Sequence, residues 1–354
     1  MNLIMILFVL VEIYYFSFFI FRILKEFTKV KLTKHLKIII IALLALLGTN
    51  LLNMYRIQTN ICLHLMVVSL VYELIFLLIK KNKVYRFLLY SGILTITTVT
   101  AIFAYGYYNI NNVIKTEYII KSDKIDNFQI LQVSDLHMGN AVNLEKLEKY
   151  VKEINKLNPD IVVLTGDIVD ESTTLKEMES AIKLLGQLNN KQGIYYIYGN
   201  HDENNYSRKR EYDTETLNKA LENNGIIILK DEHVVIDNVT LIGRIDPRRD
   251  GNIRKTTKEL LENIDKNTYM VLLDHRPIEY KENAELGIDL QISGHTHGGQ
   301  YFPSGPIEAL TTRRPVHGTM KIDSFTLLVS SGISGWGYPF KTGAPSEYVL
   351  INIE

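Results

Sequence analysis

The chain has 354 residues, and its 39 basic and 39 acidic side chains give a formal net charge of zero. This balance gives no reason to expect a polyanion as partner, and a single cysteine excludes an intrachain disulfide framework. The length leaves room for a membrane part of about 105 residues and a globular domain of about 230 residues, which is large enough to bury a substantial core.

The N-terminal third is predicted to be a membrane anchor. It contains four apolar stretches of about 17–21 residues, long enough to cross a hydrocarbon core of roughly 30 Å. They are Leu3 to Ile23, Ile38 to Met54, Ile61 to Ile79 and Phe87 to Ala104. A cleaved signal peptide is not expected, because no basic n-region with a short apolar core and a small-residue site opens the chain. Residues 1–107 are therefore predicted to form a four-helix transmembrane anchor.

Basic residues in the predicted loops indicate the orientation of this anchor. The first and third loops are basic, whereas the second has only Arg56. The basic residues are Lys25, Lys29, Lys31, Lys34 and Lys37 in the first loop and Lys80, Lys81, Lys83 and Arg86 in the third. Because such loops stay cytoplasmic, both ends of the anchor and the following domain are expected outside. Residues 108–124 are expected to be a short connector and first strand, which keeps the domain near the lipid.

The rest of the chain alternates short apolar runs with amphipathic ones. Buried strands are predicted at Phe128 to Val133, Ile161 to Thr165, Gly193 to Tyr198, Val239 to Gly243, Tyr269 to Leu273 and Ile288 to Ser293. Apolar residues that recur every three or four positions predict helices from Asn143 to Leu157 and from Thr174 to Leu188. This alternation indicates an α/β domain with a covered sheet, occupying residues 125–354.

Five polar clusters follow these strands. They are Asp135-Leu136-His137, Gly166 to Asp170, Gly199-Asn200-His201-Asp202, Asp274-His275 and Gly294 to Gln300. Ligands gather beyond the carboxyl ends of strands in such folds, and the clusters supply enough carboxylate, carboxamide and imidazole groups for two metal ions. These groups suit Mn²⁺, Fe and Zn²⁺, whereas a thiolate site is excluded because Cys62 lies far away in an apolar segment.

The clusters match the signatures D-x-H, G-D-x-x-D, G-N-H-D/E, a lone H and G-H-x-H in order. The chain from about Ile125 to its C-terminus thereby resembles the calcineurin-like metallophosphoesterases. Gly298-Gly299-Gln300, together with Asp274 to Pro277, resembles the bacterial branch that acts at the cell envelope. The resemblance implies a four-layer α-β-β-α sandwich of two sheets flanked by helices, and dimetal hydrolysis of a phosphate ester or phosphoanhydride.

The resemblance also implies a role for each site residue. One metal would be held by Asp135, His137 and His297, and the other by Asn200, His275 and His295, with Asp167 bridging them. Two divalent ions, Mn²⁺, Fe or Zn²⁺ with Mn²⁺ favoured in vitro, would then lie roughly 3.5–4 Å apart and activate a water. His201 would protonate the leaving oxygen, with Asp202 orienting and polarising its ring. Asp170 would orient a metal ligand.

Some residues have both a functional and a structural interpretation. The run from Asp246 to Asp250 could point Arg244, Arg248 or Arg249 at a phosphate, although such runs are more often solvated loops. The aromatic side chains of Trp336, Tyr338 and Phe340 could line a substrate wall or pack a C-terminal loop.

Three glycines belong to the motifs. Gly166, Gly199 and Gly294 are expected to supply positive φ in sharp turns that let the ligands approach the metals.

The sequence as a whole predicts a phosphohydrolase at the outer face of a bacterial membrane, acting on a cell-envelope or lipid-linked phosphate. The bilayer and this phosphorylated substrate are the expected partners, and no nucleic acid is expected. A nuclease or nucleotide phosphodiesterase with the same site is an alternative, disfavoured because a basic strip interleaved with aromatic residues is missing. The other alternative is a membrane sensor or transport protein whose outer domain only binds phosphorylated ligands. His201 argues against it, because binding alone does not require an acid.

Overall fold

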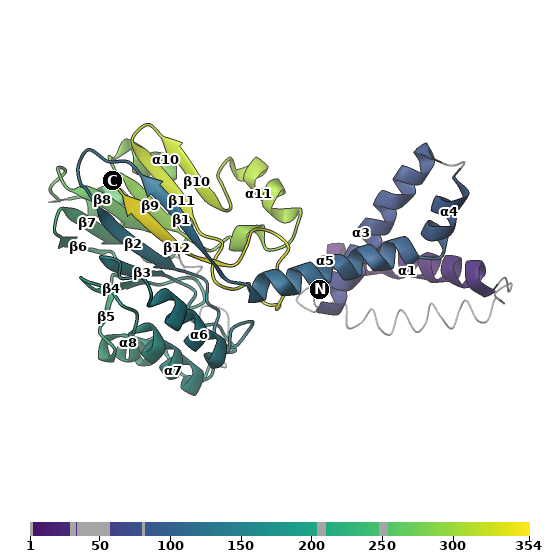
Figure 1. Cartoon of the computed structure of the whole chain (residues 1–354), viewed down its shortest axis with the longest axis horizontal. Coiled ribbons are helices and arrows are strands. Elements are labelled where there is room, and N and C mark those ends of the chain that lie inside the picture. The colour runs from purple at the N-terminus through teal and green to yellow at the C-terminus, as the bar shows by residue number, and fades with distance from the viewer. Residues whose placement is uncertain are drawn as a thin grey trace. The chain divides into compact units, whose positions relative to one another are not determined.

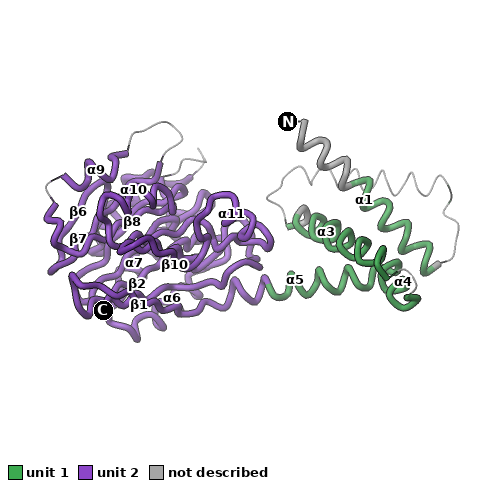
Figure 2. Tube along the Cα trace, turned by 90° about the horizontal axis from the view of Figure 1, so that it is seen from above, with its two compact units in different colours: residues 1–105 green, residues 106–354 purple. Residues whose placement is uncertain are grey.

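The computed structural model describes residues 3–28, 33, 57–79, 82–203, 210–247, 254–262 and 264–354. The chain divides into two compact units, residues 1–105 and residues 106–354 (Figure 2). The first unit contains α1 (Leu3–Thr28), α3 (Ile57–Leu78), α4 (Lys83–Tyr90) and most of α5 (Ile93–Asn111), whose last residues belong to the second unit. The predicted span from Ile38 to Met54 and most of the lysines used to predict the orientation lie outside the described residues.

Within the described residues, two helical segments are long and apolar enough to cross a membrane: Asn60–Leu78 in α3 and Ile93–Asn111, which is α5. The predicted four-helix transmembrane region is therefore not supported; the described residues contain two candidate spans, identified by length and composition alone. The predicted bounds of the last span, Phe87 to Ala104, are wrong, because the chain turns at Gly92. Gly92 has φ +76°, a left-handed conformation that ends α4 and lets a separate helix, α5, begin at Ile93.

Two six-stranded sheets form the core of the described second unit (Figure 1). The first has the order β1-β12-β2-β3-β4-β5, with β1 (Ile114–Ile120), β2 (Phe128–Val133), β3 (Ile161–Thr165), β4 (Ile194–Ile197), β5 (Ile226–Ile228) and β12 (Glu347–Ile353). The second has the order β10-β11-β9-β8-β7-β6, with β6 (Glu232–Ile236), β7 (Val239–Gly243), β8 (Tyr269–Leu273), β9 (Leu290–Ser293), β10 (Gly318–Ile322) and β11 (Phe325–Val329). All six predicted strands are confirmed, four of them with their predicted bounds.

Three apolar clusters hold the second unit together as four layers. One lies between the first sheet and α6 (Leu144–Ile154), α7 (Leu175–Leu185) and α8 (Thr214–Asn223). A second cluster fills the space between the sheets. The third lies between the second sheet and α9 (Thr257–Leu260) and α10 (Tyr280–Glu285). The expected sandwich of two sheets flanked by helices is therefore confirmed.

The predicted helices are α6 and α7. Their N-caps are Asn143 and Thr174, whose side chains accept hydrogen bonds from backbone amides of the first turn. Both helices therefore begin where the sequence indicates.

The strand register places the ends of several strands at one edge of the first sheet. β2, β3 and β4 are parallel, so their carboxyl ends share that edge. β12 runs antiparallel to β2, with Val349 opposite Gln132, and β1 runs parallel to β12, with Ile114 opposite Glu347. The start of β1 therefore lies at the edge where β2, β3 and β4 end. The stretch expected to be a connector is occupied by the last turns of α5 and by β1.

Candidate metal centre

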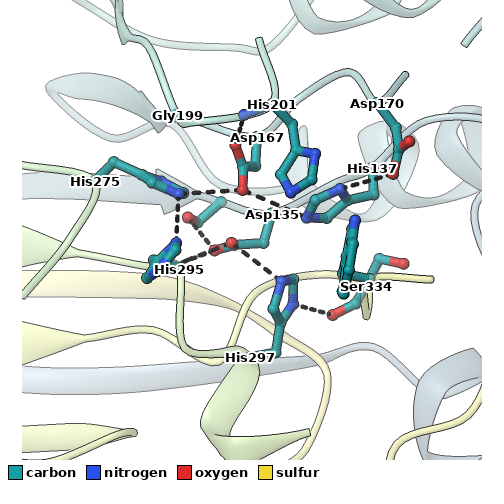
Figure 3. A network of polar contacts seen from close by, with 12 residues as sticks. Asp135, His137, Asp167, Asp170, Gly199, His201, His275, His295, His297 and Ser334 are labelled. Carbon is teal, nitrogen blue, oxygen red and sulfur yellow. Dashed lines mark hydrogen bonds and ion pairs between the residues drawn. The ribbon is translucent and has the colours of Figure 1, made fainter. Parts of the chain in front are cut away.

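The seven side chains predicted as metal ligands follow five strand ends drawn from both sheets. Asp135 and His137 follow β2, Asp167 follows β3, Asn200 follows β4, His275 follows β8, and His295 and His297 follow β9. The six carboxylates and imidazoles among them converge in one buried cluster (Figure 3). Two sets of ligand atoms stand out, one from Asp135, His137 and His297 and one from Asp167, His275 and His295.

Asp167 belongs to the second set and also faces the first. Its Oδ2 is 3.6 Å from Nε2 of His137 and 3.1 Å from Nε2 of His275. Nδ1 of His295 is a further 3.2 Å from Nε2 of His275. One carboxylate oxygen thus faces imidazoles of both sets, which is the position that a bridging ligand needs.

Groups behind the ligands fix which ring nitrogen points inward. Nδ1 of His137 lies 3.2 Å from Asp170 Oδ2, which is where the sequence placed an orienting carboxylate. Nδ1 of His275 lies 2.8 Å from the carbonyl oxygen of Thr165, and Nδ1 of His297 lies 3.3 Å from that of Ser334. In each case Nε2 is left to face the cluster. The two carbonyl groups could not be found from the sequence, because backbone oxygens carry no sequence signal.

Buried atoms without partners fit the binding of cations. Nε2 of His137 and Oδ1 of Asn200 are both buried and have no hydrogen-bond partner in the part of the chain that the structure describes. A buried polar atom left unpaired is costly, and a divalent cation bound at each of the two positions would satisfy them. Asn200 is otherwise joined to the cluster through its neighbour, since the amide of His201 donates to Asp167 Oδ1 over 2.8 Å.

The electrostatics of the cluster suit ligation by nitrogen and oxygen. Burial and the charge of His275 lower the pKa of His295 well below its usual value, and burial and His137 do the same to His297, so both imidazoles are neutral. Burial opposes ionisation of Asp167, but the neighbouring histidines outweigh it and hold the pKa of this carboxyl well below its usual range.

The other two histidines respond differently. Burial opposes protonation of His137 and His275, yet the adjacent carboxylates outweigh it and raise the pKa of each ring. Binding of a cation at either ring would therefore release a proton. The donor set and its geometry fit a dimetal site with histidine and aspartate ligands.

Five of the ligand residues adopt a left-handed backbone conformation. The φ values are 53° for Asp135, 42° for His137, 51° for Asp167, 70° for His295 and 49° for His297. Residues other than glycine rarely adopt such angles, and each costs of order 1 kcal/mol or more. The cluster compensates in part through its own main chain, because the amide of His295 donates to both carboxylate oxygens of Asp135 at 3.1 Å.

The motif glycines serve two different purposes. Gly166 has φ +87°, as expected. The same expectation is wrong for Gly199 and Gly294, whose φ values are not positive. A Cβ on Gly199 would lie 2.2 Å from Asp167 Oδ1, and one on Gly294 would lie 2.3 Å from Asp135 Oδ2. Glycine is needed there because the ligand carboxylates occupy the space of a side chain.

His201 lies beside the metal cluster. Its ring centroid is 5.0 Å from that of His137 and 5.6 Å from that of Trp336. Its Nδ1 lies 2.7 Å from Glu171 Oε1. Glu171 therefore occupies the position beside the ring in which a carboxylate can orient and polarise it.

Asp202 does something else. Its buried carboxylate accepts four main-chain hydrogen bonds of 2.7 to 3.1 Å, from the amides of Asp167, Ile168, Val169 and Gly199. The expectation that Asp202 polarises the His201 ring is wrong, because both carboxylate oxygens are committed to these amides. Asp202 instead ties the loop after β3 to the loop after β4, and each of these loops carries a predicted ligand.

Arg244 does not face the site. Its buried guanidinium contacts Glu279 at 2.6 Å, Thr257 Oγ1 at 3.1 Å and the carbonyl oxygen of Lys255 at 2.9 Å. The phosphate contact considered for Arg244 is therefore wrong, and residues 248–250 of the adjoining loop lie outside the described residues.

The three C-terminal aromatic residues were expected either to line a substrate wall or to pack a loop, and they differ in this respect. Tyr338 and Phe340 are buried, and their ring centroids lie 5.9 and 5.7 Å from that of Tyr301, so they pack the loop. Trp336 is half-buried and is the one of the three that lies next to His201.

Comparisons with known proteins agree with this geometry. Residues 128–299 match the family described as calcineurin-like phosphoesterase. An uncharacterized metallophosphoesterase of Aquifex aeolicus is 31% identical over 247 residues, which cover 68% of this chain and 89% of that protein. One from Helicobacter pylori strain 26695 is 30% identical over 236 residues, covering 65% of this chain but only 61% of the relative.

A Danio rerio relative carries a name that mentions the membrane. This "transmembrane protein with metallophosphoesterase domain" is 29% identical over 244 residues, covering 65% of this chain and 54% of that protein. The family match, the relatives and the ligand cluster at the strand ends lead to one conclusion. The chain belongs to the calcineurin-like metallophosphoesterase family.

Proposed function

We propose that the chain is a dimetal-dependent phosphohydrolase that acts on a phosphate ester or phosphoanhydride of a cell-envelope component or lipid. The observation that carries this proposal is the position of Asp167 between two sets of imidazoles, with buried atoms of His137 and Asn200 that lack hydrogen-bond partners among the described residues. A cation in each set would satisfy these atoms and place two positive charges next to each other, as in two-metal phosphoester hydrolysis.

Each site residue then has a task. Asp135, His137 and His297 would hold one metal, Asn200, His275 and His295 would hold the other, and Asp167 would be shared. The bound ions, for which we propose Mn²⁺ before Fe or Zn²⁺, supply an activated water and neutralise the phosphoryl oxygens. His201 donates a proton from Nε2 to the leaving oxygen, and its Nδ1–H donates to Glu171, which orients the ring.

Turnover of a nitrophenyl phosphodiester by the full chain with Mn²⁺ tests this function, with Asp167→Asn as the inactive control. Turnover should depend on added metal and disappear on chelation. Lipid pyrophosphates, lipid-linked sugars, teichoic-type polymers and nucleotides are then compared as substrates. Binding of phosphorylated ligands without turnover of any of them would contradict the proposal and favour a sensor. A strong preference for nucleotides would contradict the substrate class alone.

The proposed location is the outer face of a bacterial membrane, with a multi-pass anchor of four helices. It is supported by the two apolar helices α3 and α5 and by the basic side chains of Lys25, Lys83 and Arg86 near helix ends. Protease added to wall-stripped cells should remove the second unit, and a phosphatase reporter fused after Glu354 should be active. A second unit that becomes cleavable only after lysis would contradict this orientation.

A further inference from the structure

We propose that the metal-site end of the second unit rests on the bilayer, and that a lipid-contact patch lets the site take its phosphate from a lipid in that bilayer. The lipid-contact patch consists of Phe302, Ile307 and Leu310, on or just before α11 (Ser304–Thr312), together with Tyr107 and Tyr108 of α5. The proposal rests on the proposed hydrolase function and on α5 crossing the membrane.

The helix α11 presents its apolar side chains to solvent. Leu310, Phe302 and Ile307 are 81%, 66% and 55% exposed, whereas the one buried residue of this fully described helix is Gly305. The helices α6 and α7 bury their apolar residues against the first sheet instead. An outward apolar face on a short surface helix is unusual and marks a contact surface. Tyr107 and Tyr108 add two aromatic rings that are 63% and 62% exposed.

The length of α5 indicates what this surface contacts. The part of α5 in the first unit, from Ile93 to Tyr105, is only about 20 Å long at 1.5 Å per residue. A hydrocarbon core is roughly 30 Å thick, so a crossing needs the rest of the helix as well. That remainder belongs to the second unit, where Asn109 and Ile110 are buried. If α5 crosses the bilayer, the surface around its last turns must therefore lie at the lipid boundary.

The same end of the second unit carries the metal site. α5 leads to the start of β1, and strand register places that start at the edge where β2, β3 and β4 hand over to the ligand loops. Figures 1 and 2 show α11 and the last turns of α5 at the same end of this unit.

A single segment, Phe340 to Ala344, joins the parts of the patch. Asn109 donates to the carbonyl oxygen of Lys341 over 3.0 Å, and the amide of Phe302 donates to Thr342 Oγ1 over 3.0 Å. The short helix that holds His297 leads directly into α11, with Ser304 hydrogen-bonded to the carbonyl oxygen of Gly299.

The chemistry of the surface favours a bilayer over a protein partner. Tyrosine side chains are enriched at the level of lipid head groups, and an exposed Arg313 next to the apolar face of α11 suits their phosphates. The covalent link through α5 also keeps this surface at the membrane without a separate binding step. A lipid whose phosphate lies at the head-group level would meet the metal ligands without leaving the bilayer.

The test compares two substrates that release the same nitrophenolate, one soluble and one attached to a lipid. The full chain is reconstituted in phosphatidylcholine bilayers, and kcat/KM is measured for ethyl nitrophenyl phosphate and for a lipid nitrophenyl phosphodiester. We expect Ile307→Ser with Leu310→Ser to lower kcat/KM for the lipid substrate at least roughly tenfold, since burial of one such side chain contributes about one order of magnitude. Hydrolysis of the soluble substrate should change by less than about twofold.

The matched control replaces two other exposed apolar residues, which lie at the opposite end of the sheets. Ile119→Ser with Val235→Ser, at sites 63% and 57% exposed, should leave both reactions unchanged. An equal loss on both substrates in the α11 variant, or an equal loss in the control, would overturn the proposal.

A second readout does not depend on turnover. Cys62 is the single cysteine, so a dye can be attached at Leu310→Cys or Val235→Cys after Cys62→Ser. Nitroxide-labelled phospholipid should quench the dye at position 310 and not at position 235. Quenching in a protein that hydrolyses neither substrate would refute the hydrolase function while supporting the patch. An unquenched dye at position 310 in an active protein, or one shielded by a second copy, would overturn the lipid contact.

Discussion

Replacing Asp202 with asparagine should destabilise the second unit and loosen the metal centre. Oδ2 of Asp202 accepts the amides of Asp167 and Gly199, and Oδ1 accepts those of Ile168 and Val169. An asparagine keeps one of the two oxygens, so two buried amides lose their acceptor whichever way the side chain turns. At about 1–3 kcal/mol for each, the loss would be about 2–6 kcal/mol.

Part of that loss is recovered. Burial and the nearby charge of Asp167 raise the pKa of Asp202, so the ionised carboxylate is itself unfavourable and its removal brings some relief. We therefore expect a net loss of about 3 kcal/mol. For a unit of this size, such a change should lower the Tm by roughly 6–12 °C.

Fluorescence of Trp336, the only tryptophan, follows unfolding of the second unit, and bound metal is measured on the same samples. The control is Asp213→Asn, at an exposed helix N-cap where asparagine caps equally well, so its Tm should hardly change. Asp202→Asn should also bind metal more weakly, because Asp167 and the loop of Asn200 shift together. A variant with an unchanged Tm that slows mainly on poor leaving groups would refute this role and restore the ring-polarising one.

Four further outcomes follow from the structure. Asp167→Asn should lower bound metal from two ions toward one or none, as measured by elemental analysis, and two tightly bound ions in an active variant would reject the bridging role. His201→Ala should keep its metal yet lose roughly 10²–10⁴-fold in rate on alkyl esters and much less on nitrophenyl esters. Glu171→Gln should show the same dependence on leaving group, with a smaller loss in rate than His201→Ala. An equal loss in rate on alkyl and nitrophenyl esters would count against a role for its contact with the ring. Burial lowers the pKa of Lys341 from 10.5 to about 7. Between these two pH values the unfolded chain therefore carries a proton on Lys341 that the folded chain lacks. The free energy of unfolding of protein whose metal has been removed by a chelator should then rise with pH across that window. Urea unfolding at both ends of the window checks the slope, which Lys341→Met should flatten.

The sequence was sufficient to predict six of the twelve described strands and the order of the ligand clusters. A buried strand must be apolar and must end where the chain becomes polar, as β3 does before Asp167. Hydropathy also marked an apolar stretch that contains most of α5. It could not mark where that helix begins, because the turn at Gly92 depends on packing within the first unit.

The sequence could not predict which side chains contact each other. Asp202 follows His201 directly, yet adjacent side chains point in different directions, and the carboxylate beside the ring comes from Glu171, 30 residues earlier. Similarly, the acid that neutralises Arg244 is Glu279, 35 residues later. The left-handed backbone of the ligand residues is also a product of tertiary crowding, which no local pattern encodes.

The position of β12 has a consequence for how the protein is made. β1 and β2 follow each other in the chain, but β12 lies between them in the sheet, and the contact between Thr116 and Glu347 joins residues 231 positions apart. A ribosome must synthesise almost the entire second unit before β1 can find its partner. Until then β1 and β2 have unpaired edges that other strands can join. A chain that stalls or is cut before Glu347 would therefore be left with an open sheet and a strong tendency to aggregate.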